Sequence, residues 1–218
     1  MRQLFPPVAN TIARFSIIGG IVAVAALVFT LGLLDRSPYK TQVNVPVEQP
    51  VPFSHEHHVG QLGIDCRYCH TSVENSSFAN VPSTDICMTC HSQLYTDSPM
   101  LAPVRESLQT GQPLEWNRVN TLPDFVYFDH SAHVEHGVAC EECHGRVDQM
   151  PLTWKAQTLN MGFCLDCHRD PGPRLRPENE VFSMTWQPPA DQATQGQKLL
   201  QDYHIDVNLL TQCSTCHR

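Results

Sequence analysis

The sequence predicts short α-helices and irregular segments behind one N-terminal transmembrane helix, and three observations lead to this fold class. The 218 residues include 17 prolines, which interrupt long helices and large sheets. The apolar content of 41% includes ten cysteines and one uncharged run, residues 15–34, which alone supplies 15 apolar residues. The aliphatic side chains that are left are too few for a core of ordinary size. Something other than secondary structure is therefore expected to organise the chain.

The uncharged run is expected to be a transmembrane helix. Its 20 residues span about 30 Å as an α-helix, which matches the hydrocarbon thickness of a bilayer. A cleaved signal peptide is the alternative, but the run exceeds a usual signal-peptide core and no small-residue cleavage site follows Leu34. We expect an uncleaved anchor with its flanks over residues 1–40. Gly19, Gly20 and Gly32 would let neighbouring helices approach closely, although an isolated tether fits the glycine content equally well.

The charge distribution excludes a nucleic-acid-binding protein. No acidic residue precedes Asp35, so residues 35–218 carry all 22 acidic residues against 12 of the 14 basic ones, a net charge of −10. Proteins that bind nucleic acids need a basic surface, and this region does not have the composition for one.

All ten cysteines belong to five C-x-x-C-H motifs, and none is left over. Two thiols three residues apart reach the two vinyl groups of one porphyrin, and the following histidine binds its iron. A disulfide framework would not require a histidine after every second cysteine, and zinc sites would need paired C-x-x-C knuckles. The motifs therefore predict five covalently bound haem c groups and a multihaem cytochrome c whose porphyrins form the core. The haem-binding residues are Cys66, Cys69, His70, Cys87, Cys90, His91, Cys140, Cys143, His144, Cys164, Cys167, His168, Cys213, Cys216 and His217.

Haem attachment also predicts the orientation in the membrane. Lys and Arg are placed too evenly around the anchor for the positive-inside rule to decide it. Covalent c-type attachment takes place on the outer side of an energy-transducing membrane. Residues 35–218 are therefore expected to face the periplasm, or its equivalent, from a single-pass anchor in the cytoplasmic (inner) membrane.

An internal repeat organises the motifs. Phe53–Val59 and Phe128–Val134 share the pattern F-x-H-x-x-H-V, and each copy leads into a C-x-x-C-H motif. A second motif follows after a spacer of 16 residues in the first copy and 19 in the second. We expect a first two-haem module with its insert at residues 41–125, a second two-haem module at 126–178, and a C-terminal segment with the fifth haem at 179–218.

The inserts are expected to hold two short helices, at residues 98–111 and 191–203. The first begins with a Ser-Pro pair, which is typical of a helix start, and Gly111 is typical of a helix end. Prolines clustered at residues 46–52 and 171–189 predict extended straps.

Seven histidines outside the motifs are candidates for the sixth ligand of the haem irons. Low-spin electron-transfer haems need this second axial ligand, and histidine gives a lower potential than methionine. In H-x-x-H the two imidazoles lie on one side of a helical turn and can serve two different haems. For the isolated His136, a solvated surface role is an equal alternative.

The F-x-H-x-x-H pattern together with C-x-x-C-H resembles the class III multihaem cytochromes c. In that family the first histidine of the pair ligates the haem of the adjacent motif, and the second ligates another haem nearby. The resemblance implies that each of these four histidines supplies the sixth ligand of one haem iron. The implied pairs of iron ligands are His55 with His70, His58 with His91, His130 with His144, and His133 with His168.

The anchor, the five motifs and four longer stretches resemble the pentahaem cytochrome c subunit of alternative complex III, a quinol-oxidising respiratory or photosynthetic complex. The resemblance implies that quinol is oxidised elsewhere in the complex, and that electrons pass from an iron–sulfur subunit through the five haems to a monohaem cytochrome or other soluble acceptor. It also implies multihelical membrane subunits on the anchor, and a subunit without substrate chemistry of its own. The four stretches are Phe53–Val73, Pro113–Val134, Leu159–Arg169 and Leu210–Arg218.

The fifth haem departs from the repeat, because no H-x-x-H precedes Cys213. His204 stands nine residues before this cysteine, close to the eleven and ten residues that separate the first histidines of the repeat from their motifs. His57 is the second candidate for the sixth ligand, because it has no counterpart in the other copy. Met161 is the third, although apolar packing is the commoner role of a single methionine.

Two other functions stay open. A multihaem reductase with a five-coordinate haem would show a high-spin ferric signal, and an anchored quinol dehydrogenase would oxidise quinol without partners. Seven histidines are available for the sixth coordination positions of five haem irons. This supply favours a protein that only transfers electrons, because no iron needs an open position. The predicted span also holds no ionisable side chain to accept the protons that quinol oxidation releases.

Overall fold

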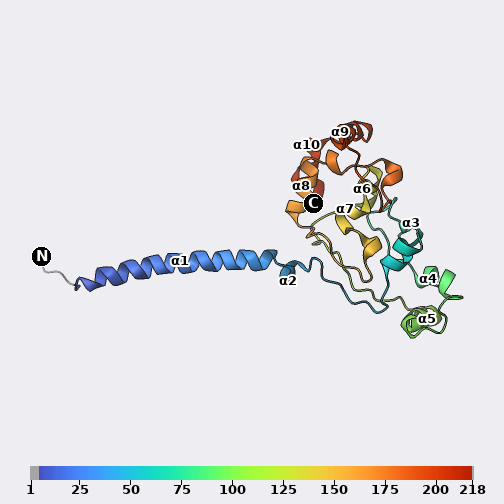
Figure 1. Ribbon diagram of the computed structural model, residues 1–218, viewed down its shortest axis with the longest axis horizontal. Coiled ribbons are helices and arrows are strands. Elements are labelled where there is room, and N and C mark those ends of the chain that lie inside the picture. Colours follow the sequence, from blue (N-terminus) through green and yellow to red (C-terminus); the bar gives the residue numbers. More distant parts are fainter. Residues whose placement is uncertain (1–4, 218) are drawn as a thin grey trace. The chain divides into compact units, whose positions relative to one another are not determined.

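The computed structural model describes residues 5–217 and divides into two compact units that separate between Gln42 and Val43. The first unit holds helix α1 (Val8–Arg36) and the single turn α2 (Pro38–Thr41). The second holds all five C-x-x-C-H motifs (Figure 1). Residues 43–218 form one compact unit, and the three modules expected within it stay a prediction.

The predicted membrane helix is confirmed as a helix, but it is longer than the uncharged run. It begins at Val8 because two prolines precede it at a helix start, where their missing N–H groups cost nothing. It ends before Ser37, whose extended backbone is the conformation favoured ahead of Pro38. The most apolar 18-residue stretch of α1 has a mean hydropathy of 2.6, and no residue of α1 is buried, so the helix is long and apolar enough to cross a membrane.

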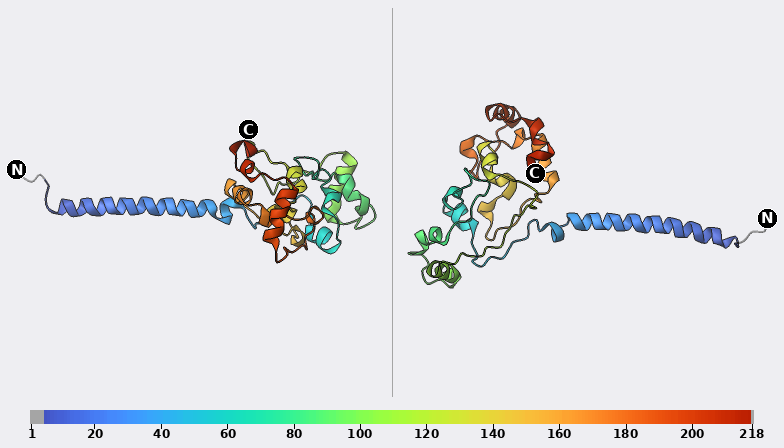
Figure 2. Two further views of the ribbon diagram at one scale, coloured as in Figure 1. Left: turned by 90° about the horizontal axis from the view of Figure 1, so that it is seen from above. Right: turned by 180° about the vertical axis from the view of Figure 1, so that it is seen from behind.

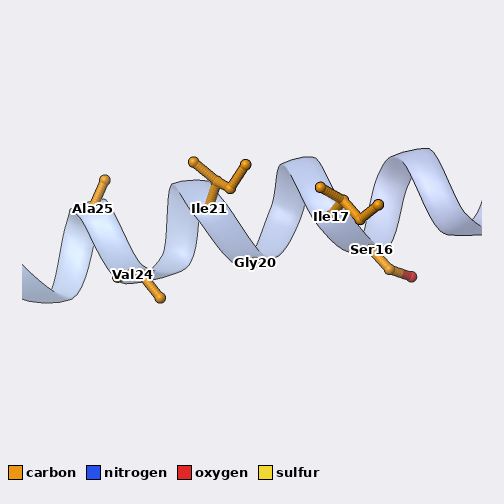
Figure 3. Close-up of a pocket in the computed structure, with 6 residues that line it drawn as sticks. All are labelled: Ser16, Ile17, Gly20, Ile21, Val24 and Ala25. Carbon is orange, nitrogen blue, oxygen red and sulfur yellow. The ribbon is translucent and has the colours of Figure 1, made fainter.

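One face of α1 carries a shallow apolar groove around Gly20. In the close-up of Figure 3, Ile17 and Ile21 project from one side while the backbone at Gly20 is left bare. A methyl group added at Gly20 would meet no other atom of this chain within 4 Å, and the same holds for Gly19 and Gly32. The helix therefore has room for a close neighbour, and packing against one stays a prediction.

The second unit is built of short helices and irregular segments, as predicted. Within its described residues there are four isolated β-bridges and no strand. The α-helices are α3 (Cys66–Cys69), α4 (Thr84–His91), α5 (Ala102–Thr110), α6 (His130–Glu135), α7 (Cys140–His144), α8 (Met161–Arg169), α9 (Gln192–Asp202), α10 (Val207–Leu210) and α11 (Cys213–Cys216). Shorter turns are the π-helical η1 (Glu56–Gln61) and the 3₁₀ segments η2 (Pro99–Leu101), η3 (Val147–Gln149), η4 (Gly172–Arg174) and η5 (Glu178–Glu180).

Both helices expected in the inserts are confirmed. The segment at 98–111 splits into η2 and α5 because Pro103 has no N–H to continue the first turn, and Gly111 ends α5 in the left-handed region at φ 69°. The segment at 191–203 is α9, which packs on η4. At their contact Gly196 lies directly against the backbone of Gly172, so a side chain there would not fit.

Protein side chains form only a small core. The buried apolar cluster consists of Val73, Val134 and Val181, with Phe182 packed against it. This cluster joins the segment after α3 to α6 and to the strap before α9. The small core agrees with the prediction that secondary structure and aliphatic packing alone do not organise this unit.

The segment at 171–189 was expected to be extended, but it contains the 3₁₀ turns η4 and η5. A buried arginine in this segment, not expected from the sequence, ties it to α7. Arg176 is 1% exposed and forms ion pairs with the carboxylates of Glu141 and Glu142. Its guanidinium also donates to the carbonyl oxygen of Ser183 and lies 4.5 Å from the ring centre of Trp186. Such a buried ion pair costs several kcal/mol when one partner is removed, because the other charge is left unpaired.

The first strap runs beside a distant segment of the same unit. Val43 and Pro46 form bridges to Lys155 and Trp154, and the Val47 N–H donates to the carbonyl oxygen of Thr153 at 3.1 Å. These contacts place the strap next to the segment that leads into α8.

Candidate haem-binding sites

Each C-x-x-C-H motif lies on a short helix, which brings its two cysteines to one face. The helices are α3, α4, α7, α8 and α11, and we number their sites 1 to 5 in chain order. Residues three apart are neighbours on a helix surface, so both thiols of a motif point to the same side. All ten thiols are unpaired with one another, as covalent attachment of a porphyrin requires.

The histidine that ends a motif is held through its Nδ1 atom at four of the five sites. In each case Nδ1 lies within hydrogen-bond distance of a backbone carbonyl oxygen, which only accepts, so Nδ1 carries the proton. The Nε2 lone pair is then free to bind a metal, and the ring is oriented for it. The pairs are His70 with Asn80 (2.6 Å), His91 with Leu94 (3.2 Å), His168 with Leu210 (3.0 Å) and His217 with Phe125 (3.1 Å).

Site 3 uses a side chain instead. The Nδ1 atom of His144 lies 3.1 Å from the amide nitrogen of Asn120, whose buried oxygen has no partner. Rotating the amide by half a turn exchanges its oxygen and nitrogen, and the oxygen then accepts the Nδ1 proton of His144. This assignment gives His144 the same tautomer as the other four histidines. No motif in the sequence marks Asn120, which lies 24 residues away.

The four histidines of the H-x-x-H copies are held in the same way. The Nδ1 atoms of His58, His130 and His133 lie 2.8, 2.8 and 2.7 Å from backbone carbonyl oxygens. His55 is the exception, since its Nδ1 atom lies 3.0 Å from the hydroxyl oxygen of Thr153. The three rings that face carbonyl oxygens are therefore fixed with Nε2 free, and the Thr153 contact orients the ring of His55.

Three of the predicted ligand pairs face each other across a gap of constant width. The ring centroids are 6.1 Å apart for His58 and His91, 6.3 Å for His130 and His144, and 6.2 Å for His133 and His168. Two metal–imidazole bonds of about 2 Å, plus the distance from each nitrogen to its ring centre, amount to about 6 Å. The residues present therefore fit a haem iron held between two imidazoles, and the three pairings stay predictions that this geometry favours.

The fourth predicted pair, His55 with His70, is near but not in ring contact. The pKa of His55 is lowered to about 4, mainly by burial and to a smaller extent by the neighbouring imidazoles of His70, His58 and His144. Burial also lowers the pKa of His144 to about 4, with added contributions from His130 and His70. Neutral imidazole is the form that binds a metal, so burial keeps these rings ready for ligation at neutral pH.

A cavity of about 280 Å³ lies at site 2, between His58 and His91. Its walls are mainly apolar, which suits the face of a porphyrin. His57 also lines it, and the Nδ1 atom of His57 lies 2.9 Å from the side-chain oxygen of Gln61. The structure therefore places this candidate for the fifth haem at site 2. The other lining residues are Val51, Pro52, Phe53, Ser54, Tyr95, Ser98, Met100, Leu101 and Val104.

Site 5 differs from the others. His217 stacks on the ring of Phe125, with centroids 5.8 Å apart, and within residues 5–217 its ring contacts are with this phenylalanine. His204 lies exposed in the turn after α9, at a left-handed φ of 55°. Met161 is 64% exposed at the start of α8. The sixth ligand of site 5 stays a prediction among His204, His57 and Met161.

No protein-family model matches the chain. It is similar to the multihaem cytochrome c subunit of menaquinone reductase from Nitratidesulfovibrio vulgaris (strain Hildenborough), with 38% identity over 122 residues. The alignment covers 56% of this chain and spans about half, 55%, of that relative. The similarity supports the prediction of a multihaem cytochrome c with covalently bound haem.

Proposed function

We propose that the protein is a membrane-anchored pentahaem cytochrome c that relays electrons within a quinol-linked respiratory or photosynthetic complex. The observation that carries the proposal is the set of three facing histidine pairs, each beside a C-x-x-C-H motif. Bound haem c supplies one-electron oxidation and reduction of its iron. At these three sites a histidine on both faces would leave no coordination position for a substrate, which favours an electron-transfer subunit over a reductase.

The chain's own residues hold and insulate the redox groups. The cysteine pairs would fix each porphyrin covalently, and the facing histidine pairs of sites 2, 3 and 4 would hold their irons from both faces. Residues 35–218 lie on the outer side of the cytoplasmic membrane in this proposal, with α1 as the single-pass anchor. Its partners are an iron–sulfur subunit, multihelical membrane subunits and a monohaem or other soluble electron acceptor.

Two directions of electron flow are consistent with these features. In alternative complex III, which the sequence resembles, electrons leave quinol and reach an outer acceptor through the haems. The relative from Nitratidesulfovibrio is named as part of a menaquinone reductase, which favours the opposite direction as a second candidate. In both cases quinone chemistry needs proton-exchanging groups that the uncharged run at residues 15–34 lacks, which favours a quinone site on another subunit.

Haem reduction by a quinol analogue tests the proposal. We expect fast reduction in the intact membrane complex, inhibited by quinone-site inhibitors, and no fast reduction of the purified subunit. The same complex, reduced beforehand through an outer donor and then given quinone, distinguishes the two directions. Equal rates of reduction in the isolated subunit and in the complex would make the chain a quinol dehydrogenase and overturn the proposal.

A further inference from the structure

The contacts between the five motifs define an order in space that differs from their order in the sequence. We infer that the attachment sites form one unbranched row in the order 2, 1, 3, 4, 5, so that electrons enter and leave at sites 2 and 5. This inference rests on the proposed electron-transfer function and adds the route to it. Electron tunnelling slows steeply with distance, so each electron passes to the neighbouring site in the row.

Site 2 adjoins site 1. The hydroxyl groups of Tyr68 and Thr89, which are inner residues of the two motifs, lie 2.7 Å apart. The thiol of Cys69 also lies near that of Cys87. The first H-x-x-H copy lies between the same two sites, because its second histidine faces the histidine of site 2 while its first is nearest to that of site 1.

Site 1 adjoins site 3, although the motif of site 2 separates them in the sequence. The pKa of the Cys140 thiol is raised first by the Cys66 thiol beside it and then by burial. The imidazole of His70 at site 1 also lies near that of His144 at site 3. Three hydrogen bonds from His130 and Ser131, at the start of α6, to the backbone carbonyl oxygens of Ser76 and Ser77 hold this junction together.

Sites 3 and 4 share helix α6. His130 faces the histidine of site 3 and His133, one turn along, faces that of site 4. The thiol of Cys143 also lies near those of Cys167 and Cys164.

Site 4 adjoins site 5. Helix α10, which precedes the fifth motif, packs on α8, and the Nδ1 atom of His168 donates to the carbonyl oxygen of Leu210 at 3.0 Å. The pKa of the Cys164 thiol is raised by burial and by the thiol of Cys216.

The two ends of the row are also the most open sites. Cys90 of site 2 and Cys213 of site 5 are exposed, whereas the other eight motif cysteines are partly buried. Among residues 5–217, no hydrogen bond or ring contact joins the motif of site 2 to those of sites 3, 4 or 5. Figure 1 shows α4 and α5 at one end of this unit, α8 to α10 at the other, and α3, α6 and α7 between them, and the view from behind in Figure 2 keeps this order.

Removing one haem at a time from the full-length holoprotein tests the order. Neighbouring redox groups shift each other's potentials, so the loss of an inner member of the row affects two neighbours and the loss of an end member affects one. The test variant, Cys66→Ala with Cys69→Ala, should shift the midpoint potentials of two of the four remaining haems. The matched control, Cys87→Ala with Cys90→Ala, should shift one. One shift in the test variant and two in the control would show that the row follows the sequence and would overturn the inference.

The wild-type protein gives a second measurement that does not depend on the variants maturing. Iron positions from anomalous scattering should give the iron of site 1 two close neighbours, at sites 2 and 3, and the iron of site 2 one. Five covalent haems in any other arrangement would overturn the order and leave the proposed function intact. Fewer than five haems by mass spectrometry of the denatured protein would overturn both.

Discussion

The two H-x-x-H copies place their histidines alike on different backbones. In the first copy the ring of Phe53 stacks on His58 at 4.4 Å and meets His55 edge-on at 4.9 Å. The second copy repeats this arrangement, with centroid distances of 4.5 and 4.8 Å around Phe128. The interplanar angles agree as well, at 21° and 26° for the stacked pairs and 87° and 89° for the edge-on pairs.

The backbones of the copies differ. The second copy is an ordinary α-helical turn, α6, whereas the first is the π-helical turn η1, in which the Leu62 N–H donates to the carbonyl oxygen of His57 five residues earlier. The η1 turn packs on η3, and Gly60 lies directly against the backbone of Asp148. The comparison indicates that the phenylalanine and the Nδ1 contacts orient the imidazoles, and that the helix type adapts to its neighbours.

The largest expected effect comes from removing a ligand. His130→Ala should leave the iron of site 3 five-coordinate and high-spin, with the other four haems low-spin, because that imidazole serves one iron. His55→Ala should do the same at site 1 if the two copies are equivalent. Electron paramagnetic resonance of the ferric protein measures both. The absence of a new high-spin signal in either variant would reject that ligand pairing.

Removing the shared aromatic ring should have the next largest effect. Phe53→Ala and Phe128→Ala each remove a partly buried ring and two ring contacts, at an expected cost of about 1–3 kcal/mol in the free energy of unfolding. Because the ring geometry is the same, the two losses should be similar, as measured by denaturant unfolding of the holoprotein. Phe→Leu at each position is the control that keeps the apolar volume. A loss at one position alone would show that the rings are not equivalent.

The third prediction uses the one Nδ1 contact that differs between the copies. His55 is held by the Thr153 hydroxyl, whereas His130 is held by a backbone carbonyl oxygen. Thr153→Val should therefore cost about 1 kcal/mol of hydrogen bonding and shift the midpoint potential of one haem. Thr153→Ser keeps the hydroxyl and should leave all five potentials in place. A potentiometric titration without any shift in the valine variant would contradict this role.

The smallest expected effect concerns the turn that starts each copy. Asp129 caps α6 by accepting from the Ala132 N–H, while the Ser54 hydroxyl accepts from the His57 N–H in the first copy. Hydrogen bonding from the Ser131 hydroxyl lowers the pKa of Asp129 below its usual 3.8. The charged form is therefore favoured in the folded protein, and its contribution is present above pH 3.8 and is lost as the pH falls through the lowered pKa.

Replacing the caps tests this difference. Asp129→Ala and Ser54→Ala should each cost about 1 kcal/mol near neutral pH. The cost of Asp129→Ala should shrink as the pH falls below 3.8, and the cost of Ser54→Ala should not change over the same range. Unfolding free energies measured between pH 6 and pH 3 make the comparison, and parallel pH profiles for the two variants would contradict it.

The sequence alone was enough to predict the features that depend on local spacing. The helix of the anchor, the helices at 98–111 and 191–203, and the small aliphatic core follow from patterns within a few turns of chain. The same local spacing predicts the five attachment motifs and the two H-x-x-H copies, since two thiols or two imidazoles three residues apart meet on one helix face.

The tertiary structure decided which distant residues contact the histidines and cysteines of the motifs. Several contacts join segments more than twenty residues apart, and no local pattern marks them. They are the contact of Asn120 with His144, that of Thr153 with His55, and the buried ion pairs of Arg176. The π-helical turn of the first copy and the contact between sites 1 and 3 are of the same kind. The physical reason is that helix spacing specifies which side chains share a face, while the partner of that face depends on where distant segments converge in the folded unit.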